Sequence, residues 1–250
     1  MMKNFTIIIP VRYASERLPG KPLLDIAGKS MVQRVYEQAL QVGAKKVIIA
    51  TDDARIQHAA EQFSAPVVMT STDHVSGTDR LEEVVSQLQL ADHEIVVNVQ
   101  GDEPLIPPDF IQQVAEQLKN STADMATLSM PIMQLEDIFN PNIVKLVTNH
   151  QGLALYFSRA PIPWDRENFP QALNHSGWQR HIGIYAYRVG LLHEFVSWPA
   201  APMEKIERLE QLRALYYGKQ IQVAQVAYAP DPGVDTLEDL ERVRARVSRK

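Results

Sequence analysis

The stretch IIIPVRYASERLPGKP, residues 7–22, carries the strongest evidence in the sequence for the fold. Its first part is a short apolar run, which predicts a buried β-strand. Its second part is a loop that holds Arg12, Arg17 and Lys21 among three prolines. The chain has a formal net charge of −5, so three cations in one stiff loop require their own explanation.

The loop lacks the glycine patterns of the best-known phosphate-binding turns. A dinucleotide fingerprint needs G-x-G-x-x-G, and a Walker loop needs Gly-Lys followed by Ser or Thr. Here Gly20 stands alone and Pro22 follows Lys21. Charge must therefore come from side chains, with Arg12 and Arg17 forking onto phosphate oxygens and Lys21 acting as a point charge. We predict phosphate binding; the alternative is a solvated basic loop.

Strand-like and helix-like segments alternate through the first half of the chain. Four apolar runs within residues 5–100 predict strands, with amphipathic helices between them. Because these runs lack strict alternation, they predict a mostly parallel sheet covered by helices on both faces, an α/β fold. Ligands bind beyond the carboxyl ends of such strands, so a site is expected in the loops after Pro10, Thr70 and Gln100.

The second half is less regular. Short apolar runs predict further strands, and MEKIERLEQLRALYYG, residues 203–218, predicts one amphipathic helix that ends at Gly218. The side chains expected on its inward side are Ile206, Leu209, Leu212 and Tyr216. A last helix is predicted after Thr236, with Asp239 completing its capping box.

Composition excludes several classes of protein. The 250 residues, 45% of them apolar, suffice for one substantial domain. The absence of cysteine excludes disulfides, thiolate zinc sites and cysteine nucleophiles. The negative net charge argues against a general nucleic-acid binder, and no apolar stretch reaches the roughly 20 residues of a membrane span. The amino terminus does not read as a signal peptide, so we expect a cytoplasmic protein.

Two acidic segments are candidates for binding a metal. Asp102 and Glu103 come directly after a predicted strand, a position that favours a divalent cation bridging phosphates; the alternative is an acidic turn that begins the next helix. Asp235 directly precedes the helix cap Thr236, where a carboxylate also complements the helix dipole. If Asp235 lies near Asp102 in space, the pair would complete a magnesium site.

Polar segments elsewhere could bind the rest of a substrate. TSTDHVSGTDR, residues 70–80, offers His74 and Arg80 to a nucleobase edge, or it caps a helix. A second group suits an acidic, hydroxyl-rich ligand, although a lone histidine in a strand is more often a core residue. Its members are Arg159, Arg166, His181, Tyr185 and Tyr187. Glu210 and Gln211 could bind sugar hydroxyls, or belong to a solvated helix face.

Eight segments together resemble one enzyme family. They are IIIPVRYASERLPGKPL, ATDD, SGTDR, VNVQGDEP, ALYFSRAPIPWDR, RHIGIYAYR, LEQLRALYYG and GVDTLEDLERVR. Their combination resembles the 3-deoxy-manno-octulosonate (Kdo) cytidylyltransferases, or CMP-Kdo synthetases. The resemblance extends from about residue 5 to about residue 247. The first loop alone is shared by many sugar nucleotidyltransferases, whereas the combination is much narrower.

The resemblance implies a reaction and an architecture. The family transfers CMP from CTP to the 2-hydroxyl of Kdo, releasing pyrophosphate, for lipopolysaccharide synthesis. The implied fold is a Rossmann-like nucleotidyltransferase α/β fold, with a mixed, mostly parallel sheet flanked by helices and a smaller subregion. We expect one domain over residues 1–250, with a nucleotide-binding core of about 1–130 and 220–250. Residues of about 131–219 would bind the sugar and form a homodimer.

The resemblance also implies roles for residues. The catalytic set is Arg12, Arg17, Lys21, Asp102 and Asp235. The implied CTP contacts are Arg12, Ser15, Lys21, Ser76, Arg80 and Asp102. The implied sugar contacts are Gln100, Arg159, Arg166, His181, Tyr185, Glu210 and Gln211. Asp102 and Asp235 would hold Mg²⁺, the expected cofactor.

Three rival hypotheses stay open at this point. The chain could be a cytidylyltransferase for another acidic sugar, such as amino-Kdo or sialic acid. It could be a glycosyltransferase of related fold, or a nucleotide-binding module without catalysis. Pyrophosphate release from CTP and a free sugar separates the first from the other two.

Overall fold

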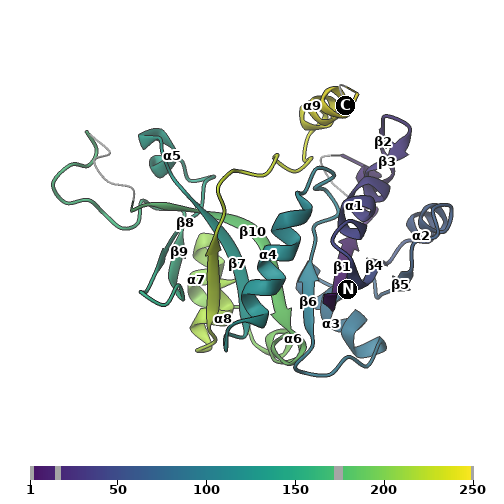
Figure 1. The fold of residues 1–250 in the computed structure, drawn as a ribbon, viewed down its shortest axis with the longest axis horizontal. Helices are drawn as coiled ribbons and strands as arrows, with labels where there is room; N and C mark the ends of the chain where they lie inside the picture. Colours follow the sequence, from purple (N-terminus) through teal and green to yellow (C-terminus); the bar gives the residue numbers. More distant parts are fainter. Residues whose placement is uncertain (1–2, 15–17, 172–176, 249–250) are drawn as a thin grey trace.

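The computed structural model describes residues 3–14, 18–171 and 177–248, and it builds them around one nine-stranded sheet (Figure 1). The strands are β1 (Lys3–Val11), β2 (Asp25–Ile26), β3 (Lys29–Ser30), β4 (Ala44–Thr51), β5 (Val67–Met69), β6 (Ile95–Asn98), β7 (Met125–Pro131), β8 (Lys145–Thr148), β9 (Ala154–Ser158), β10 (Gln179–Arg188) and β11 (Ile221–Gln225), of which β2 and β3 form a separate hairpin. The helices are the short 3-10 helix η1 (Lys21–Leu23), α1 (Met31–Leu40), α2 (Ala54–Glu61), α3 (Gly77–Gln87), α4 (Pro108–Lys119), α5 (Leu135–Phe139), α6 (Val189–Ser197), α7 (Pro202–Glu207), α8 (Leu212–Tyr216) and α9 (Leu237–Val247). The α/β fold predicted from the sequence is confirmed.

The strand order is β11-β7-β10-β6-β1-β4-β5. Strands β4 and β6 both pair in parallel with β1, and β5 continues the parallel set beyond β4. The chain thus moves to one side of β1 for β4 and β5 and to the other side for β6. This reversal is a topological switch point, the place where open α/β sheets bind ligands.

The long strand β10 makes the sheet mixed. It runs antiparallel to both β6 and β7 and lies between them. Its amino-terminal end also pairs with β8, which forms a hairpin with β9. Because β10 inserts between strands that are closer together in the sequence, the sheet is continuous across the boundary expected near residue 130. The division into a nucleotide-binding core and a sugar-binding part therefore stays a prediction.

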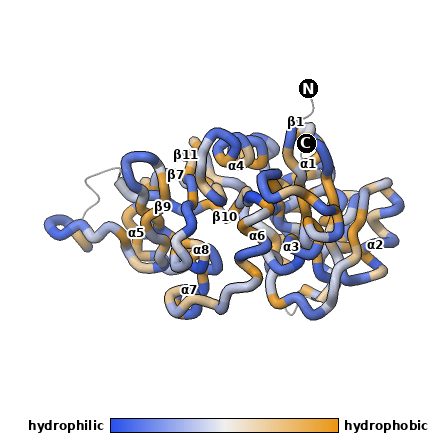
Figure 2. Tube along the Cα trace, turned by 90° about the horizontal axis from the view of Figure 1, so that it is seen from below, coloured by the Kyte–Doolittle hydropathy of each residue, from blue (hydrophilic) through white to orange (hydrophobic). Residues whose placement is uncertain are grey.

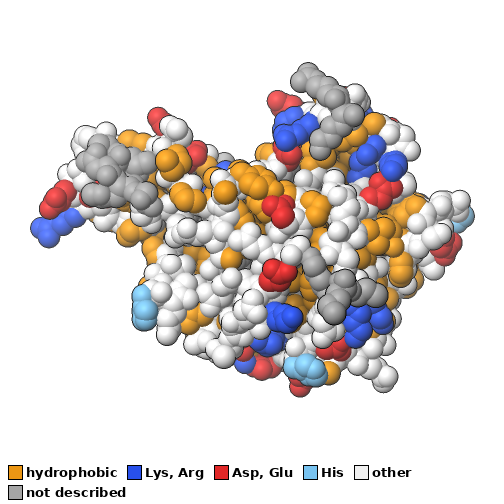
Figure 3. All heavy atoms as spheres, viewed as in Figure 1, with side chains coloured by type: hydrophobic (Ala, Val, Ile, Leu, Met, Phe, Trp, Pro, Cys, Tyr) orange, Lys and Arg blue, Asp and Glu red, His pale blue; other side chains and the backbone are white. Residues whose placement is uncertain are grey.

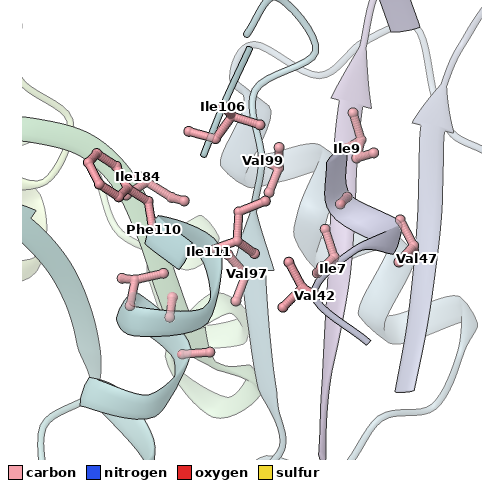
Figure 4. Packing of buried hydrophobic residues seen from close by; sticks show 14 of the residues in the cluster. Ile7, Ile9, Val42, Val47, Val97, Val99, Ile106, Phe110, Ile111 and Ile184 are labelled. Atoms are coloured by element: carbon pink, nitrogen blue, oxygen red, sulfur yellow. The ribbon is translucent and has the colours of Figure 1, made fainter. Parts of the chain in front are cut away.

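Alternate residues of β1 bury themselves on opposite faces of the sheet. Ile7 and Ile9 belong to a cluster with α1, α2 and α4, and Figure 4 shows Ile7 level with Val97 and Ile9 level with Val99. Ile8 belongs to a second cluster with α3, α6 and α8. Both faces of β1 are thus buried, which is why its sequence is a continuous apolar run.

Different helices and strands lie at the two ends of the molecule. In Figure 2, α5, β7 and β9 lie toward one end, and α2 and α3 lie toward the other. On the face shown in Figure 3, acidic, basic and hydrophobic side chains are interspersed. No helix in the described ranges is both long enough and apolar enough to cross a lipid bilayer.

Helices α3 and α9 each begin with a capping box, and the box predicted at Thr236 is confirmed. Ser76 caps α3 and accepts a hydrogen bond from the amide of Asp79, whose side chain accepts one from the amide of Ser76. Thr236 and Asp239 form the same box at α9. Each box satisfies two amides that the first turn of a helix leaves unpaired.

The single helix predicted over residues 203–218 is wrong. The segment forms α7 and α8, and Arg208 between them adopts a left-handed conformation with φ of 55°. The break turns Ile206 outward to 83% exposure and leaves Tyr216 51% exposed, although both were expected inside. Leu209 and Leu212 are buried as predicted. A left-handed arginine is uncommon, so helical periodicity alone does not reveal this break.

Candidate active site

A cavity of about 350 Å³ lies at the switch point of the sheet. Segments that follow β1 and β6 line it, together with one residue from the segment that precedes α9. Its polar and charged lining includes Arg12, Lys21, Gln100, Asp102 and Asp235. The sequence prediction that a site lies beyond the carboxyl ends of these strands agrees with the position of this cavity.

The loop after β1 turns sharply at Gly20. This residue has a φ of 66°, and a Cβ atom there would lie 3.0 Å from the hydroxyl oxygen of Tyr13. The amide of Gly20 donates to the carbonyl of Tyr13, and Arg55 stacks 3.3 Å from the centre of the Tyr13 ring. These contacts aim Lys21 into the cavity. Ser15 and Arg17, which were also predicted here, lie outside the described residues.

Lys21 joins the two predicted metal ligands. Its Nζ donates to Asp102 Oδ2 at 2.8 Å and to Asp235 Oδ1 at 3.2 Å. The same nitrogen donates to the carbonyl of Val234 at 2.9 Å. Asp102 and Asp235 are 133 positions apart in the chain, yet both lie within reach of one cation. The convergence that the sequence could only suggest is present in the fold.

Backbone contacts bring Asp235 to this place. The amide of Val234 donates to the carbonyl of Asp102 at 2.8 Å, which ties the segment before α9 to the loop after β6. Val234 itself packs into a small apolar cluster with Ile26 and Leu240. The capping box of α9 then fixes the direction of the chain immediately after Asp235.

Close packing of two backbones positions Asp102. A Cβ atom on Gly101 would lie only 3.0 Å from the carbonyl oxygen of Pro10, so any larger residue would push the two loops apart. Burial and the neighbouring Asp102 carboxylate raise the pKa of Glu103 to about 8. Glu103 is therefore protonated at neutral pH.

The donor set fits a magnesium ion that is shared with phosphates. Within the described ranges, no three His, Asp or Glu side chains gather as a metal cage. Mg²⁺ does not need one, because it is commonly held by one or two carboxylates, substrate phosphates and water. Asp102 and Asp235 already converge on the Lys21 ammonium, so their oxygens can face a common cation.

The predicted nucleobase loop contacts the first loop through Arg12. Its Nη2 donates to the carbonyl oxygens of His74 and, at 3.4 Å, of Ser76. The hydroxyl of Ser76 serves the helix cap described above. Arg80 is fully buried and donates to Thr70 and, at 2.6 Å, to Asp52. In this arrangement Arg80 supports the loop from within, and its direct contact with CTP stays a prediction.

Strand β10 places two predicted sugar contacts, Tyr185 beside β6 and His181 beside β7. Tyr185 is the register partner of Asn98, two residues before the cavity-lining Gln100. The rings of His181 and Tyr185 lie 5.4 Å apart, and His181 Nε2 shares a 3.0 Å hydrogen bond with the Thr127 hydroxyl. Burial lowers the pKa of His181 to about 3 and raises that of Tyr185. Both side chains are therefore neutral at physiological pH.

The turn between α7 and α8 brings two more predicted sugar contacts into the interior. Glu210 Oε2 accepts a hydrogen bond from the Thr78 hydroxyl at 2.8 Å. Within the described residues, Glu210 Oε1 and Gln211 Nε2 are buried without a partner, and so is Asn98 Oδ1. Burial raises the pKa of Glu210, an effect that the Thr78 hydrogen bond opposes. Buried polar atoms without partners are rare, and a hydroxyl-rich ligand would satisfy them.

Sequence reasoning missed Asn98 and Thr78 as members of this polar group. Asn98 interrupts the apolar run EIVVNVQ, and that single polar residue in a buried strand was the available signal. Thr78 carried no signal, because a threonine in the first turn of a helix is ordinary.

The two predicted arginines of the sugar site have different surroundings. Arg159 directly follows β9 and is held by hydrogen bonds to Glu207 and to the carbonyl of Pro141. Arg166 is exposed in the segment between β9 and β10 and does not line the cavity. Its role stays a prediction that the observed geometry does not support.

The sequence is similar to proteins of one enzyme family along nearly its whole length. The cytidylyltransferase family profile matches residues 6–221. A 3-deoxy-manno-octulosonate cytidylyltransferase of Vibrio vulnificus (strain CMCP6) is 58% identical over 249 residues, which are 99% of each chain. The protein of the same name from Idiomarina loihiensis is 56% identical over 246 residues, covering 96% of this chain and 97% of the relative.

Solved structures lead to the same family. A CMP:2-keto-3-deoxy-manno-octonic acid synthetase complexed with CTP superposes with a TM-score of 0.90 and 44% identity over 99% of each chain. A cytidylyltransferase of Leptospira borgpetersenii shares the fold alone, with a TM-score of 0.63 and 17% identity over 100% of this chain and 88% of its own. The chain belongs to the 3-deoxy-manno-octulosonate cytidylyltransferase family.

Proposed function

We propose that this chain transfers CMP from CTP to the 2-hydroxyl of Kdo, giving CMP-Kdo and pyrophosphate for lipopolysaccharide synthesis. The observation that carries the proposal is the meeting of Lys21 with Asp102 and Asp235 in a cavity at the switch point of the sheet. A cation and two carboxylates at that place suit a metal-bound triphosphate better than any uncharged ligand.

The first loop would bind the phosphates. A triphosphate carries about four negative charges, and in this type of transfer positioning and charge neutralisation provide most of the catalysis. Arg12 and Lys21 line the cavity and would neutralise the departing pyrophosphate. Arg17 would add a third cation from the same loop, and Ser15 a further contact to CTP.

Asp102 and Asp235 would hold Mg²⁺, the cofactor that we propose. When bound, the ion would neutralise phosphate charge and lower the pKa of the attacking hydroxyl. In the structure Lys21 lies against both carboxylates. Its flexible stem lets the ammonium turn toward the phosphate tail of CTP once the carboxylates have another cation.

The sugar would lie against β10 and the turn between α7 and α8. Arg159 would receive its carboxylate. Glu210 Oε1 and Gln211 Nε2, which have no hydrogen-bond partner among the described residues, would bind its hydroxyls. Because His181 and Tyr185 are neutral, they would contribute hydrogen bonds rather than charge, and Gln100 would connect this region with the cavity.

Pyrophosphate release tests the proposal. Purified protein with CTP, Kdo and Mg²⁺ should release pyrophosphate, and the same mixture without sugar should release almost none. Release that needs no sugar, or no release at all, would contradict the proposed transfer. Parallel assays with amino-Kdo and sialic acid decide which acidic sugar is preferred; we expect Kdo.

We further propose a homodimer that acts in the cytoplasm, where CTP is made. Large apolar side chains are exposed in the region assigned to dimerisation, among them Met133, Leu155 and Trp164 at 70%, 60% and 59%. A paired surface would cover such residues. Light scattering after size-exclusion chromatography should give twice the mass of the 28.2 kDa chain. A monomer at micromolar concentration would contradict this part of the proposal.

A further inference from the structure

Glu207, the last residue of α7, grips the end of β9. Its Oε2 accepts a hydrogen bond from the amide of Arg159 at 2.9 Å, and its Oε1 accepts one from the hydroxyl of Ser158 at 2.6 Å. The carbonyl oxygen of Glu207 also accepts a hydrogen bond from Arg159 Nε at 2.7 Å. One residue thus fixes both the main chain and the side chain of Arg159.

Lys145 holds the same residue from the other side. Its side chain is fully buried, and its Nζ donates to the carbonyl of Arg159 at 2.6 Å. The other two hydrogen bonds go to the carbonyls of Ile143, at 2.6 Å, and Asn140, at 3.0 Å. A lysine is rarely fully buried. All three hydrogen-bond donors of the Lys145 ammonium are used on the turn and the strand end around Arg159.

The contacts leave one edge of the Arg159 guanidinium open. Nε is bound to Glu207, and Nη1 donates to the carbonyl of Pro141 at 2.9 Å. Nη2 donates to none of the residues that the structure describes. A guanidinium fixed at two nitrogens with a third available is prepared to bind a carboxylate.

The same glutamate connects Arg159 with the rest of the polar group. After Glu207 the chain turns through Arg208 in its left-handed conformation and reaches Glu210 and Gln211. Glu210 and Gln211, the predicted hydroxyl-binding residues, therefore lie close in the chain to Glu207, which anchors the predicted carboxylate-binding Arg159.

We infer that Glu207 and Lys145 are positioning residues of the sugar subsite, which hold Arg159 at a fixed place relative to Glu210 and Gln211. The inference rests on the proposed function, which assigns Arg159 to the carboxylate of an acidic sugar. Neither residue needs to touch the sugar. Their effect is to set the distance between the group that binds the carboxylate and the groups that bind the hydroxyls.

Glu207→Gln tests the inference, because it removes the negative charge and one of the two oxygens that accept hydrogen bonds from the Ser158 hydroxyl and the Arg159 amide. The KM for Kdo should rise by about tenfold, the size expected for loss of one charge-assisted hydrogen bond, while the KM for CTP stays within about twofold. Glu94→Gln is the matched control. Glu94 accepts a backbone amide and a lysine near the amino end of β6, and both KM values should stay unchanged.

A double-mutant cycle shows whether Glu207 acts through Arg159. Arg159→Ala should raise the KM for Kdo, and adding Glu207→Gln to it should change that KM by less than about threefold. If Arg159→Ala leaves the KM for Kdo unchanged, the assignment of Arg159 in the proposed function is wrong, and the inference falls with it. If Arg159→Ala raises it but Glu207→Gln adds its full penalty in both backgrounds, only the positioning inference is overturned.

Ser158→Ala decides the matter if Glu207→Gln does not fold. It removes the donor to Oε1 and leaves the hydrogen bond between Oε2 and the Arg159 amide. The inference expects a smaller increase that is confined to the KM for Kdo. Equal increases in both KM values, or no change in either, would contradict it.

Discussion

The ammonium nitrogen of Lys21 lies 2.8 Å from Oδ2 of Asp102. This pair joins the loop after the first strand to the loop after β6, on the two sides of the switch point. Since Asp235 also reaches the same nitrogen, the arrangement is a ready-made contact between one cation and two carboxylates. In the proposed mechanism this contact rearranges when CTP and Mg²⁺ bind.

Replacing Lys21 should abolish most of the activity. We expect Lys21→Ala to lower kcat by at least about a hundredfold, because it removes a preorganised charge beside the departing phosphates. Steady-state pyrophosphate release measures the loss. Lys29→Ala, which breaks a surface pair with Glu37, should behave like the parent. A Lys21→Ala enzyme with a near-normal rate would remove this lysine from the mechanism.

Asp102→Asn should change the response to metal while leaving the fold intact. An amide oxygen binds Mg²⁺ less well than a carboxylate, so half-maximal activity should need about tenfold more Mg²⁺. A titration of pyrophosphate release against Mg²⁺ gives this value, with circular dichroism as the check on folding. Asp109→Asn, at an exposed position of α4, should keep the parental titration. If Asp102→Asn needs the same Mg²⁺ concentration for half-maximal activity as the parent, the assignment of Asp102 as a metal ligand is wrong.

Acid should destabilise the protein partly through His181. Burial lowers its pKa to about 3, whereas an unfolded histidine titrates near about 6.5. Between these values only the unfolded chain takes up the proton. The free energy of unfolding should therefore be highest above about pH 6.5 and fall as the pH is lowered toward 3. Urea unfolding at several pH values should give a shallower acid slope for His181→Gln; equal slopes in both proteins would contradict the assignment.

Lys145→Met should destabilise the fold. The carbonyls of Ile143 and Arg159 would lose the Lys145 donor, whereas that of Asn140 keeps the amide of Ile143. We expect a loss of about 3 kcal/mol. Urea unfolding at neutral pH measures it. The control is Lys46→Met in β4, where an exposed lysine should change stability by less than about 0.5 kcal/mol. If the two variants are equally stable, the hydrogen bonds of Lys145 do not hold this turn.

The parts of the fold that local physics decides were predictable from the sequence. The apolar runs of β1, β4 and β6 and the capping boxes of α3 and α9 depend on neighbouring residues, and each is where the sequence indicates. The site near Lys21 was predictable in kind, because cations and carboxylates follow strands whose carboxyl ends share one edge of a sheet.

Long-range features could not be predicted in the same way. The insertion of β10 between β6 and β7 depends on pairing across distant segments. The break at Arg208 interrupts the helical periodicity. The buried Oε1 of Glu210 and the hydrogen bond between Glu207 and the Arg159 amide both lie beside this break. The sequence pattern around Lys145 does not predict that its side chain is buried, because its three acceptors come from segments that the fold brings together.

A crystal structure with CTP, and with Mn²⁺ in place of Mg²⁺, would show whether Asp102 and Asp235 share one metal ion beside the nucleotide. We expect an anomalous peak within coordination distance of both aspartates, next to CTP phosphates that Lys21 contacts. A metal that touches neither aspartate or only one of them, or a nucleotide bound away from the loop after β1, would contradict it.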